Sequence, residues 1–287
     1  MDTKRKIQLE RLFYLEFLAY FTGQVSRKDL VARFGVSEQA VTKDIALYAE
    51  EFAPDLLTYN VREKTYIFSG AKTYFEHDVD QSLFTLSGKS AISVDVKHEE
   101  RLSNWVNTSI KRKQSLDIVS TITRSIYQKF KIEANYYSIQ SGNKNRLLTP
   151  LAILNDGLRW HIRCFDHNDS DGKFKDYNLE RFTNVVRGEK SNVTLADDKE
   201  WNNEVIVKLI PHPEAEHPET ILKDYAITAN KNIEVKLKIC SVGYFLKQWK
   251  VDCTNNAEMN PKSHQLYLSN KAELIKNGVS TWAVGGA

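Results

Sequence analysis

Three side chains that could read DNA bases share one face of a helix predicted near the N-terminus. They are Gln39, Thr42 and Lys43, and at about 100° per residue they lie opposite the apolar residues Val41 and Ile45. Glutamine and lysine can hydrogen-bond to base edges in the major groove, whereas acidic side chains there would be repelled by phosphate. This face therefore predicts contact with double-stranded DNA, with these three residues as base or near-base contacts.

The residues before this face predict the helices of a helix-turn-helix. Apolar residues recur at helical spacing over residues 5–21, which indicates a first helix. Ser26 with Asp29 three residues later has the form of a capping box, and the helix that it begins would stop at Gly35. Ser37 can then cap the helix that carries the base-reading face.

Beyond that helix the apolar pattern changes to a period of two, which is typical of strands. Leu57 and Tyr59, then Tyr66 and Phe68, alternate on either side of a polar turn at residues 62–64. A hairpin with basic residues at its tip has the shape of the wing in a winged helix-turn-helix. The alternative is a small helical domain that happens to carry a hairpin. For the winged form we predict contacts with phosphate or the minor groove from six residues: Ser26, Arg27, Lys28, Ser37, Arg62 and Lys64.

Charge is distributed unevenly along the chain. The 287 residues have a formal net charge of +3, which argues against a strongly basic nucleic-acid binder. Residues 1–70 hold ten basic and ten acidic side chains, whereas residues 97–131 hold eight basic and three acidic ones. That excess includes the run Lys111-Arg112-Lys113, for which two interpretations stay open: a solvated helix end, or a contact with phosphate beside the winged helix.

Composition and motifs exclude several other classes of protein. With 41% apolar and 27% charged residues the chain is neither disordered nor collagenous, and no apolar run approaches a membrane span of about 18–20 residues. Three widely spaced cysteines and a poor signal peptide indicate reduced thiols in a cytoplasmic protein. His212 and His217 lie among prolines and glutamates, which we interpret as a solvated acidic loop rather than a metal site. The motifs predict no cofactor and no enzyme.

From residue 132 the chain is predicted to form strands. Segments 132–138, 146–154, 158–165 and 174–182 are separated by loops at 141–145 and 166–172 and by the turn Asn155-Asp156-Gly157. Short strands with tight turns and one apolar face describe a small, strongly bent antiparallel barrel. Before it, residues 70–96 are interpreted as an acidic connector with some strand, and residues 98–130 as helical.

Residues 115–190 resemble the WYL domain of bacterial transcriptional regulators. The tripeptide Trp-Tyr-Leu that gives this domain its name is replaced here by Trp160-His161-Ile162. The residues that support the resemblance flank it on the four predicted strands and in the turn before the third: Tyr136, Ser138, Arg146, Pro150, Leu151, Asp156, Gly157, Arg159, Arg163, Phe174, Leu179, Arg181 and Phe182. The version with histidine and flanking arginines is similar to the BrxR and CapW type, repressors of phage-defence operons such as BREX. The order of domains is similar over the full chain.

The resemblance implies a homodimeric DNA-binding regulator whose Sm-like WYL barrel binds a nucleotide or nucleic-acid ligand. Alternation along the third strand places Trp160 and Ile162 toward a core and His161 and Arg163 on the other face. If these faces converge, they form a pocket suited to phosphate and a base, lined by Tyr136, Ser138, His161, Arg163 and Arg181. The alternative is that the two arginines form ordinary ion pairs with Asp176 or Glu180.

Together these observations predict an α+β multidomain protein. Its parts would be a winged helix with connector (1–96), a helical linker (97–131), the WYL domain (132–195) and a C-terminal α+β extension for dimerisation (196–287). We expect a repressor that binds an inverted-repeat operator in the bacterial cytoplasm, with recognition helices about 34–36 Å apart. The alternative from another class is an RNA- or nucleotide-binding sensor whose N-terminal domain makes protein contacts.

Overall fold

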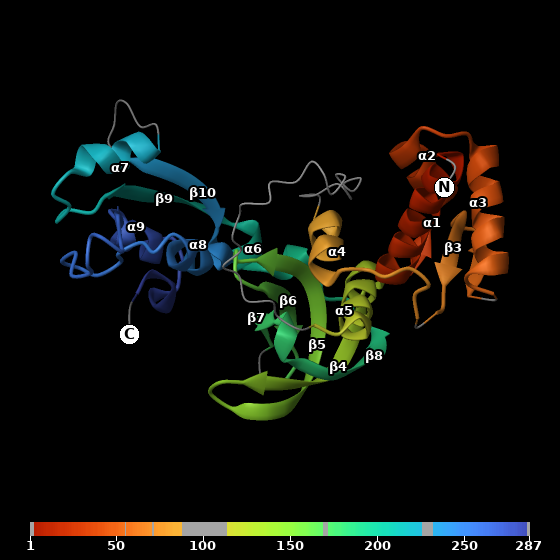
Figure 1. The fold of residues 1–287 in the computed structure, drawn as a ribbon. Coiled ribbons are helices and arrows are strands. Elements are labelled where there is room, and N and C mark those ends of the chain that lie inside the picture. The colour runs from red at the N-terminus through yellow and green to blue at the C-terminus, as the bar shows by residue number, and fades with distance from the viewer. Residues whose placement is uncertain are drawn as a thin grey trace. The chain divides into compact units, whose positions relative to one another are not determined.

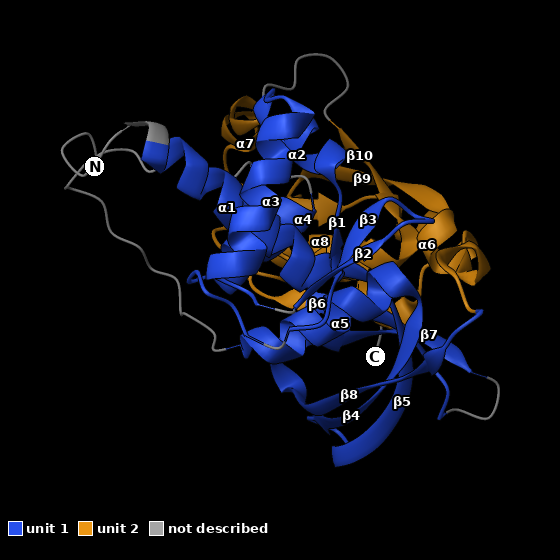
Figure 2. Cartoon of the chain, turned by 90° about the vertical axis from the view of Figure 1, so that its right-hand side faces the viewer, with its two compact units in different colours: residues 1–153, 161–192 blue, residues 154–160, 193–287 orange. Residues whose placement is uncertain are grey.

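The computed structural model describes residues 3–54, 56–70, 72–87, 114–168, 172–225 and 232–285 (Figure 1). The chain divides into two compact units, which are described separately (Figure 2). Unit 1 comprises residues 1–153 with 161–192, and unit 2 comprises residues 154–160 with 193–287. The basic run at 111–113 and the first part of the predicted linker, residues 97–113, lie outside the described residues. No helix in the described ranges is long and apolar enough to cross a membrane.

Unit 1 begins with the three predicted helices. They are α1 (Thr3–Thr22), α2 (Arg27–Phe34) and α3 (Glu38–Glu51). Ser26 and Asp29 form the predicted capping box at the start of α2, and Gly35 ends it in the left-handed conformation with φ 64°. The Ser37 hydroxyl accepts a hydrogen bond from the Ala40 amide and begins α3. These local signals predicted the helices correctly.

The wing is confirmed and has one more strand than predicted. The hairpin consists of β2 (Leu57–Asn60) and β3 (Thr65–Phe68), with the turn at residues 61–64. A two-residue strand, β1 (Gln24–Val25), pairs antiparallel with β3, so the sheet order is β1-β3-β2. This strand connects the wing to the residues just before α2, and it is too short to give a periodic signal in the sequence.

The connector that follows the wing contains a helix rather than the predicted strand. Residues 72–87 hold α4 (Val79–Leu86), and Asp78 caps it by accepting a hydrogen bond from the Gln81 amide at 2.9 Å. The prediction of strand was therefore wrong for this stretch. Farther along, α5 (Leu116–Gln128) confirms helix at the C-terminal end of the predicted helical segment.

Five antiparallel strands follow in unit 1, in the order β7-β6-β5-β4-β8. They are β4 (Phe130–Ser138), β5 (Gly142–Asn155), β6 (Trp160–Asp166), β7 (Lys173–Asn178) and β8 (Phe182–Lys190). Figure 1 shows that the sheet is strongly curved. Among the described residues β7 and β8 are its two edges, so closure into a barrel stays a prediction.

Two boundaries in this sheet differ from the prediction. The expected loop at 141–145 is strand from Gly142 onward, because these residues pair with the end of β4. The expected single strand over 174–182 is broken by a 3-10 turn at Leu179–Arg181, after which β8 begins as a separate strand. At residues 141–145 polar composition was a poor guide, since backbone pairing decides where a strand ends.

Unit 2 is a small α+β module. Its sheet has the order β10-β9-β11, from β9 (Glu204–Pro211), β10 (Ile233–Lys238) and β11 (Leu266–Leu268). The helices are α6 (Lys199–Asn202), α7 (Pro218–Asp224), α8 (Val242–Gln248) and α9 (Lys271–Lys276). A 3-10 turn at Thr281–Val284 packs against α8. The core includes Val207, Val242, Leu274 and Val284, each fully buried. This mixture of strands and helices agrees with the α+β extension expected from the sequence.

Candidate nucleic-acid interface and sensor pocket

The predicted base-reading face of α3 is exposed. Val41, Ile45 and Tyr48 are at most 3% exposed and fix the inner side of the helix. The opposite side presents Gln39, Thr42 and Lys43 to solvent. The structure therefore places these three residues together on one open helix face, as the sequence predicted.

A buried acid that the sequence analysis missed holds α3 against α1. Asp44 is 1% exposed, and its carboxylate accepts hydrogen bonds from Arg11 Nε at 2.6 Å and Nη2 at 3.2 Å, and from Gln8 Nε2 at 2.9 Å. Because Asp44 lies three residues from Val41 and four from Tyr48, its position on the apolar face was a readable signal of burial. The pairing directs the only acid in the middle of α3 away from the exposed face.

The polar groups on the α3 face differ in what they can offer to DNA. The Thr42 hydroxyl donates to the Glu38 carbonyl at 2.8 Å, which leaves an acceptor lone pair and a methyl group facing outward. In the described part of the chain, the side chains of Gln39 and Lys43 make no hydrogen bond or ion pair. A carboxamide and an ammonium that are not engaged can reach base edges or phosphate without breaking an internal contact.

Two of the residues predicted to contact phosphate, Ser26 and Ser37, already use their side chains to cap α2 and α3. The Ser26 hydroxyl donates to Asp29 Oδ2 at 2.8 Å and accepts from the Asp29 amide at 3.3 Å, so it serves the cap. Lys28 is exposed beside it. The Ser37 hydroxyl accepts from the Ala40 amide at 3.2 Å. The start of each helix carries a partial positive charge, which favours phosphate there.

Arg27 is held against the wing by a residue that the sequence analysis did not select. Its Nη2 donates to the Tyr59 hydroxyl at 3.4 Å, and its guanidinium carbon lies 5.6 Å from the centre of the Tyr59 ring. Tyr59 also packs on Tyr66 of β3, with ring centres 4.8 Å apart. The wing and the start of α2 therefore present one continuous surface, and Arg27 is pre-positioned on it.

The wing tip exposes both predicted basic residues. Arg62 and Lys64 lie in the turn after β2, and Lys64 adopts the left-handed conformation with φ 54°. The Asn60 side chain accepts hydrogen bonds from the amides of Arg62 and Glu63 at 3.1 and 3.2 Å. This turn geometry fixes the backbone of the tip while leaving both cationic side chains in solvent.

A buried carboxylate organises the segment after the wing. Glu16 on α1 is fully buried and accepts hydrogen bonds from the Tyr48 hydroxyl at 2.7 Å, the amides of Tyr74 and Phe75 at 2.8 and 2.9 Å, and His77 Nε2 at 2.9 Å. Burial by itself would raise the pKa of this carboxyl, but the hydrogen bonds outweigh burial and hold its pKa below the usual value. One acid thus connects α1, α3 and residues 74–77.

Helix α5 is bound to the winged helix through polar contacts. The Arg124 guanidinium donates to the carbonyls of Tyr20 and Gly70 and lies 4.9 Å from the centre of the Tyr20 ring. The Tyr20 hydroxyl donates to Asp117 at 2.8 Å, and the pKa of Tyr20 is raised to about 12, mainly by burial. Since α5 also packs against β8, one helix contacts both the winged helix and the curved sheet.

The predicted sensor residues on β6 are buried on both faces of the strand. Trp160 and Ile162 are in the core as expected, but His161 and Arg163 are also only 4% and 2% exposed. The Arg163 Nη1 lies 3.3 Å from Asp176 on the paired strand β7. The ion pair that the sequence analysis kept as an alternative is therefore present for Arg163. Strand alternation could not reveal this, because it does not show what covers the second face.

The structure brings together only some of the other sensor residues. The buried Tyr136 hydroxyl accepts a hydrogen bond from the Asn178 amide at 3.1 Å, and Asn178 pairs with His161 across the strands. Ser138 instead stabilises its own turn by accepting hydrogen bonds from the amides of Gln140 and Ser141. Arg181 is half-buried in the 3-10 turn between β7 and β8.

A further buried acid, Asp166 on β6, was not predicted from the sequence. Asp166 is fully buried, and its Oδ2 accepts a hydrogen bond from the Tyr177 hydroxyl at 2.6 Å and lies 3.3 Å from Lys175 and 3.4 Å from Arg146. Burial opposes ionisation of Asp166, yet the hydrogen bonds from Tyr177 and Asn168 and the charge of Lys175 keep its pKa low. The centre is a cationic and phenolic cluster around one carboxylate.

The cysteines and histidines set aside earlier have structural roles. Cys164 is fully buried and burial raises its pKa well above the usual value, so it packs as a small apolar residue. The expectation of a solvated loop is wrong for His212, which is 1% exposed and lies 3.0 Å from the buried Asp252. His217 is exposed beside Glu219. No group of three potential metal ligands occurs among the described residues.

Comparisons with known proteins match the chain in three consecutive parts. Residues 8–86 match the winged helix-turn-helix domain of the BrxR transcriptional regulator, residues 117–187 the WYL domain, and residues 204–274 the BrxR C-terminal dimerization domain. The chain is 25% identical over 279 residues to the DNA-binding transcriptional repressor CapW of Escherichia coli strain KTE188. It is 26% identical over 275 residues to the CapW of Pseudomonas aeruginosa. Each alignment covers 93% of this chain and 90% of the relative.

One solved structure aligns over nearly all of the chain. It is the proteasome accessory factor B/C (PafBC) of Arthrobacter aurescens, at 14% identity, with 95% of this chain covered. This chain spans about half of that protein, 47%, and the TM-score of 0.27 is too low to indicate a shared fold.

Proposed function

This chain is a WYL-domain transcriptional regulator with an N-terminal winged helix-turn-helix that resembles the BrxR and CapW repressors, and from that premise we propose that it represses transcription as a homodimer on an inverted-repeat operator. The observation that carries the proposal is the open α3 face with Gln39, Thr42 and Lys43. Two copies joined through the C-terminal region would place two such faces on successive major grooves.

We propose further DNA contacts from the start of α2 and from the wing tip. Lys28 and Arg27 at the start of α2, and Arg62 and Lys64 at the wing tip, would contact phosphate or the minor groove. The hydroxyls of Ser26 and Ser37 are used in caps, so helix N-terminal amides are the better donors to phosphate at those two positions. We place the protein in the bacterial cytoplasm, acting as a regulator rather than an enzyme.

The test is a titration of the full chain onto the DNA upstream of its own gene, with random duplex as competitor, at two salt concentrations. Lys43→Ala should weaken specific binding by about 1–3 kcal/mol while random duplex is bound almost as before. The matched control is Lys276→Ala, which removes one exposed charge from α9 in unit 2. Finding no duplex that is preferred over random sequence refutes the repressor proposal.

We further propose that a nucleotide or nucleic-acid ligand in the WYL domain regulates DNA binding and thereby a phage-defence operon. Arg163, Arg181, His161, Tyr136 and Ser138 are the proposed contacts, although Arg163 must first exchange Asp176 for the ligand. Support comes from α5, whose contacts to the winged helix and to β8 give a ligand at the sheet a physical route to the DNA-binding domain.

The competing function is an RNA- or nucleotide-binding sensor whose N-terminal domain makes protein contacts. Arg163→Ala and Arg181→Ala separate the two. The repressor proposal expects DNA affinity to survive and only the ligand response to disappear, whereas the sensor alternative expects all nucleic-acid binding to be lost. We also propose that the domains span residues 1–96, 97–131, 132–195 and 196–287.

A further inference from the structure

Helix α8 in unit 2 carries two apolar rows, and only one of them is fully buried. Val242 and Leu246, four residues apart, are 0% and 2% exposed and attach the helix to the core. Phe245 and Trp249 are also four apart, and their ring centres lie 6.2 Å from each other. Trp249 is 47% exposed, although tryptophan usually buries most of its surface. Nearly half of this large apolar side chain therefore lies open to solvent.

A tyrosine from another helix extends the second row into an aromatic cluster. Tyr225 directly follows α7, and its ring centre lies 6.2 Å from that of Trp249. Tyr225 and Phe245 are half-buried and pack against the core of unit 2, which holds the cluster in place. Tryptophan and tyrosine are enriched among the residues that dominate the binding energy of protein–protein interfaces. Tyr225, Phe245 and Trp249 thus have the composition of an interface centre.

The two segments that carry the aromatic cluster have opposite charges. Residues 212–225, which include α7, hold four acids and one base, for a formal charge of −3 with histidine neutral. All five of these side chains are exposed: Glu214, Glu216, Glu219, Lys223 and Asp224. Residues 244–250 hold Lys247 and Lys250 and no acid, for a charge of +2. An acidic segment and a basic segment therefore meet at the cluster.

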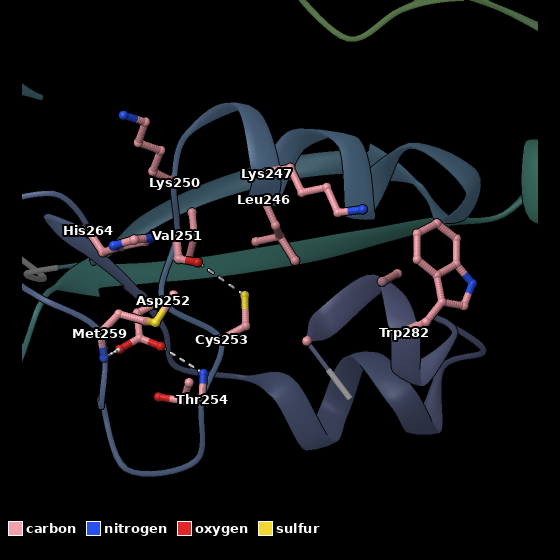
Figure 3. Close-up of a pocket in the computed structure, with 12 residues that line it drawn as sticks. Leu246, Lys247, Lys250, Val251, Asp252, Cys253, Thr254, Met259, His264 and Trp282 are labelled. Atoms are coloured by element: carbon pink, nitrogen blue, oxygen red, sulfur yellow. Dashed lines mark hydrogen bonds between the residues drawn. The ribbon is translucent and has the colours of Figure 1, made fainter. Parts of the chain in front are cut away.

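The two lysines are available to a partner. Figure 3 shows the Lys250 side chain extending away from the cavity beside it and from Lys247. The Lys247 ammonium lies 5.3 Å from the centre of the Trp282 ring. Within the described ranges of unit 2, neither ammonium makes an ion pair or a hydrogen bond. Their charge is thus not neutralised by an acid of the same copy.

We propose that the aromatic cluster is the centre of the interface between two copies of this chain. The inference rests on the proposed function, which requires a homodimer, and the cluster lies within residues 204–274, the part matched to a dimerization domain. In a twofold dimer one surface meets itself, so a surface with an acidic and a basic segment is its own complement. The acidic segment of each copy would face the α8 lysines of the other, with the two Trp249 side chains packed between them.

Sedimentation of the full chain over a range of concentrations tests the centre of this interface. Trp249→Ala should raise the dissociation constant of the dimer at least about tenfold, because a buried aromatic anchor would be lost. The matched control is Tyr137→Ala on β4 of unit 1, which removes an aromatic side chain of similar exposure, 50%, and should leave the dimer unchanged.

Exchanging the charges tests the complementarity without altering the core. One variant combines Lys247→Glu with Lys250→Glu, and the other combines Glu216→Lys with Glu219→Lys, all at exposed positions. Each variant alone should dimerise at least about tenfold more weakly, since like charges would then face each other. An equal mixture of the two should form dimers as tightly as the natural chain, because one copy then carries two acidic segments and the other two basic ones.

The outcomes separate this inference from the proposed function. If the natural chain is a dimer and the mixture dimerises no better than each variant alone, the inference is overturned and the homodimeric repressor stands. A dimer that Trp249→Ala leaves unchanged overturns the inference in the same way. A natural chain that stays monomeric at concentrations that saturate its operator overturns both.

Discussion

Replacing Glu16 with glutamine should destabilise the winged helix strongly. The carboxylate is fully buried and accepts four hydrogen bonds, two of them from backbone amides at 2.8 and 2.9 Å. Glutamine keeps one acceptor oxygen but turns an NH₂ group toward donors, so at least one buried donor loses its partner. Hydrogen bonds to a charged group contribute about 1.5–3 kcal/mol each. Losing the charge and one acceptor together should lower the free energy of unfolding of this domain by about 3 kcal/mol.

Hydrogen exchange is the suitable assay, because no tryptophan lies in residues 1–96 to report on this domain by fluorescence. The amides of Tyr74 and Phe75 should exchange about 100-fold faster in Glu16→Gln, which corresponds to the loss of about 3 kcal/mol. Glu10→Gln on the same helix is the matched control. The Glu10 side chain is half-buried and makes no hydrogen bond among the described residues, so Glu10→Gln should leave the exchange unchanged.

The pH dependence gives an independent check on the same group. Because the folded pKa of Glu16 lies below its usual value of 4.5, ionised Glu16 stabilises the fold above that pH. This stabilisation is lost as the pH falls below 4.5 and through the folded pKa. Glu16→Gln should therefore be less sensitive to acid than the natural chain over this range. Equal protection of Tyr74 and Phe75 in both proteins at neutral pH would refute the reasoning.

Substitutions at three further positions follow from the geometry. Asp44→Ala should lower the free energy of unfolding by about 3 kcal/mol in denaturant titrations, because it leaves Arg11 without its buried partner. A change below about 0.5 kcal/mol would contradict the role of Asp44 in holding α3 against α1. Tyr59→Phe should weaken DNA binding by less than about 1 kcal/mol, since only a 3.4 Å hydrogen bond to Arg27 is lost, and Tyr59→Ala should weaken it more; equal effects contradict the contribution of the ring. Gly23→Ala should lower the melting temperature, because φ is 80°, a backbone conformation that residues with a Cβ rarely adopt; an unchanged melting temperature contradicts this strain.

Local signals in the sequence were sufficient for the winged helix. The capping residues Ser26 and Ser37 act on amides within three positions, so their effect can be read without knowing the fold. The orientation of α3 followed from the spacing of Val41 and Ile45. Such features depend on neighbours in the sequence, and helix period and caps predicted them correctly.

Features that depend on distant partners could not be predicted in the same way. Glu16 meets Tyr74 across 58 positions, and Asp44 meets Arg11 across 33. The burial of His161 depends on elements that cover the outer face of the sheet, which alternation along one strand does not report. The strand β1 has two residues and no period at all. In each case the deciding contact belongs to the tertiary structure.

Residues 1–70 carry no net charge, which limits how this part of the chain can bind DNA. A domain with ten basic and ten acidic side chains cannot attract DNA by a general positive field, so its affinity must come from placed groups and from having two copies. The structure agrees with a small number of placed contacts. Asp44 and Glu16 are buried with internal partners, whereas Lys43 is exposed. A protein that depends on few, fixed contacts responds strongly when their spacing changes. Arg124 donates to the carbonyls of Tyr20 and Gly70, so α5 is joined to α1 and to the residues that follow the wing. Under the proposed arrangement on two half-sites, a movement of α5 would shift the DNA-binding face relative to them.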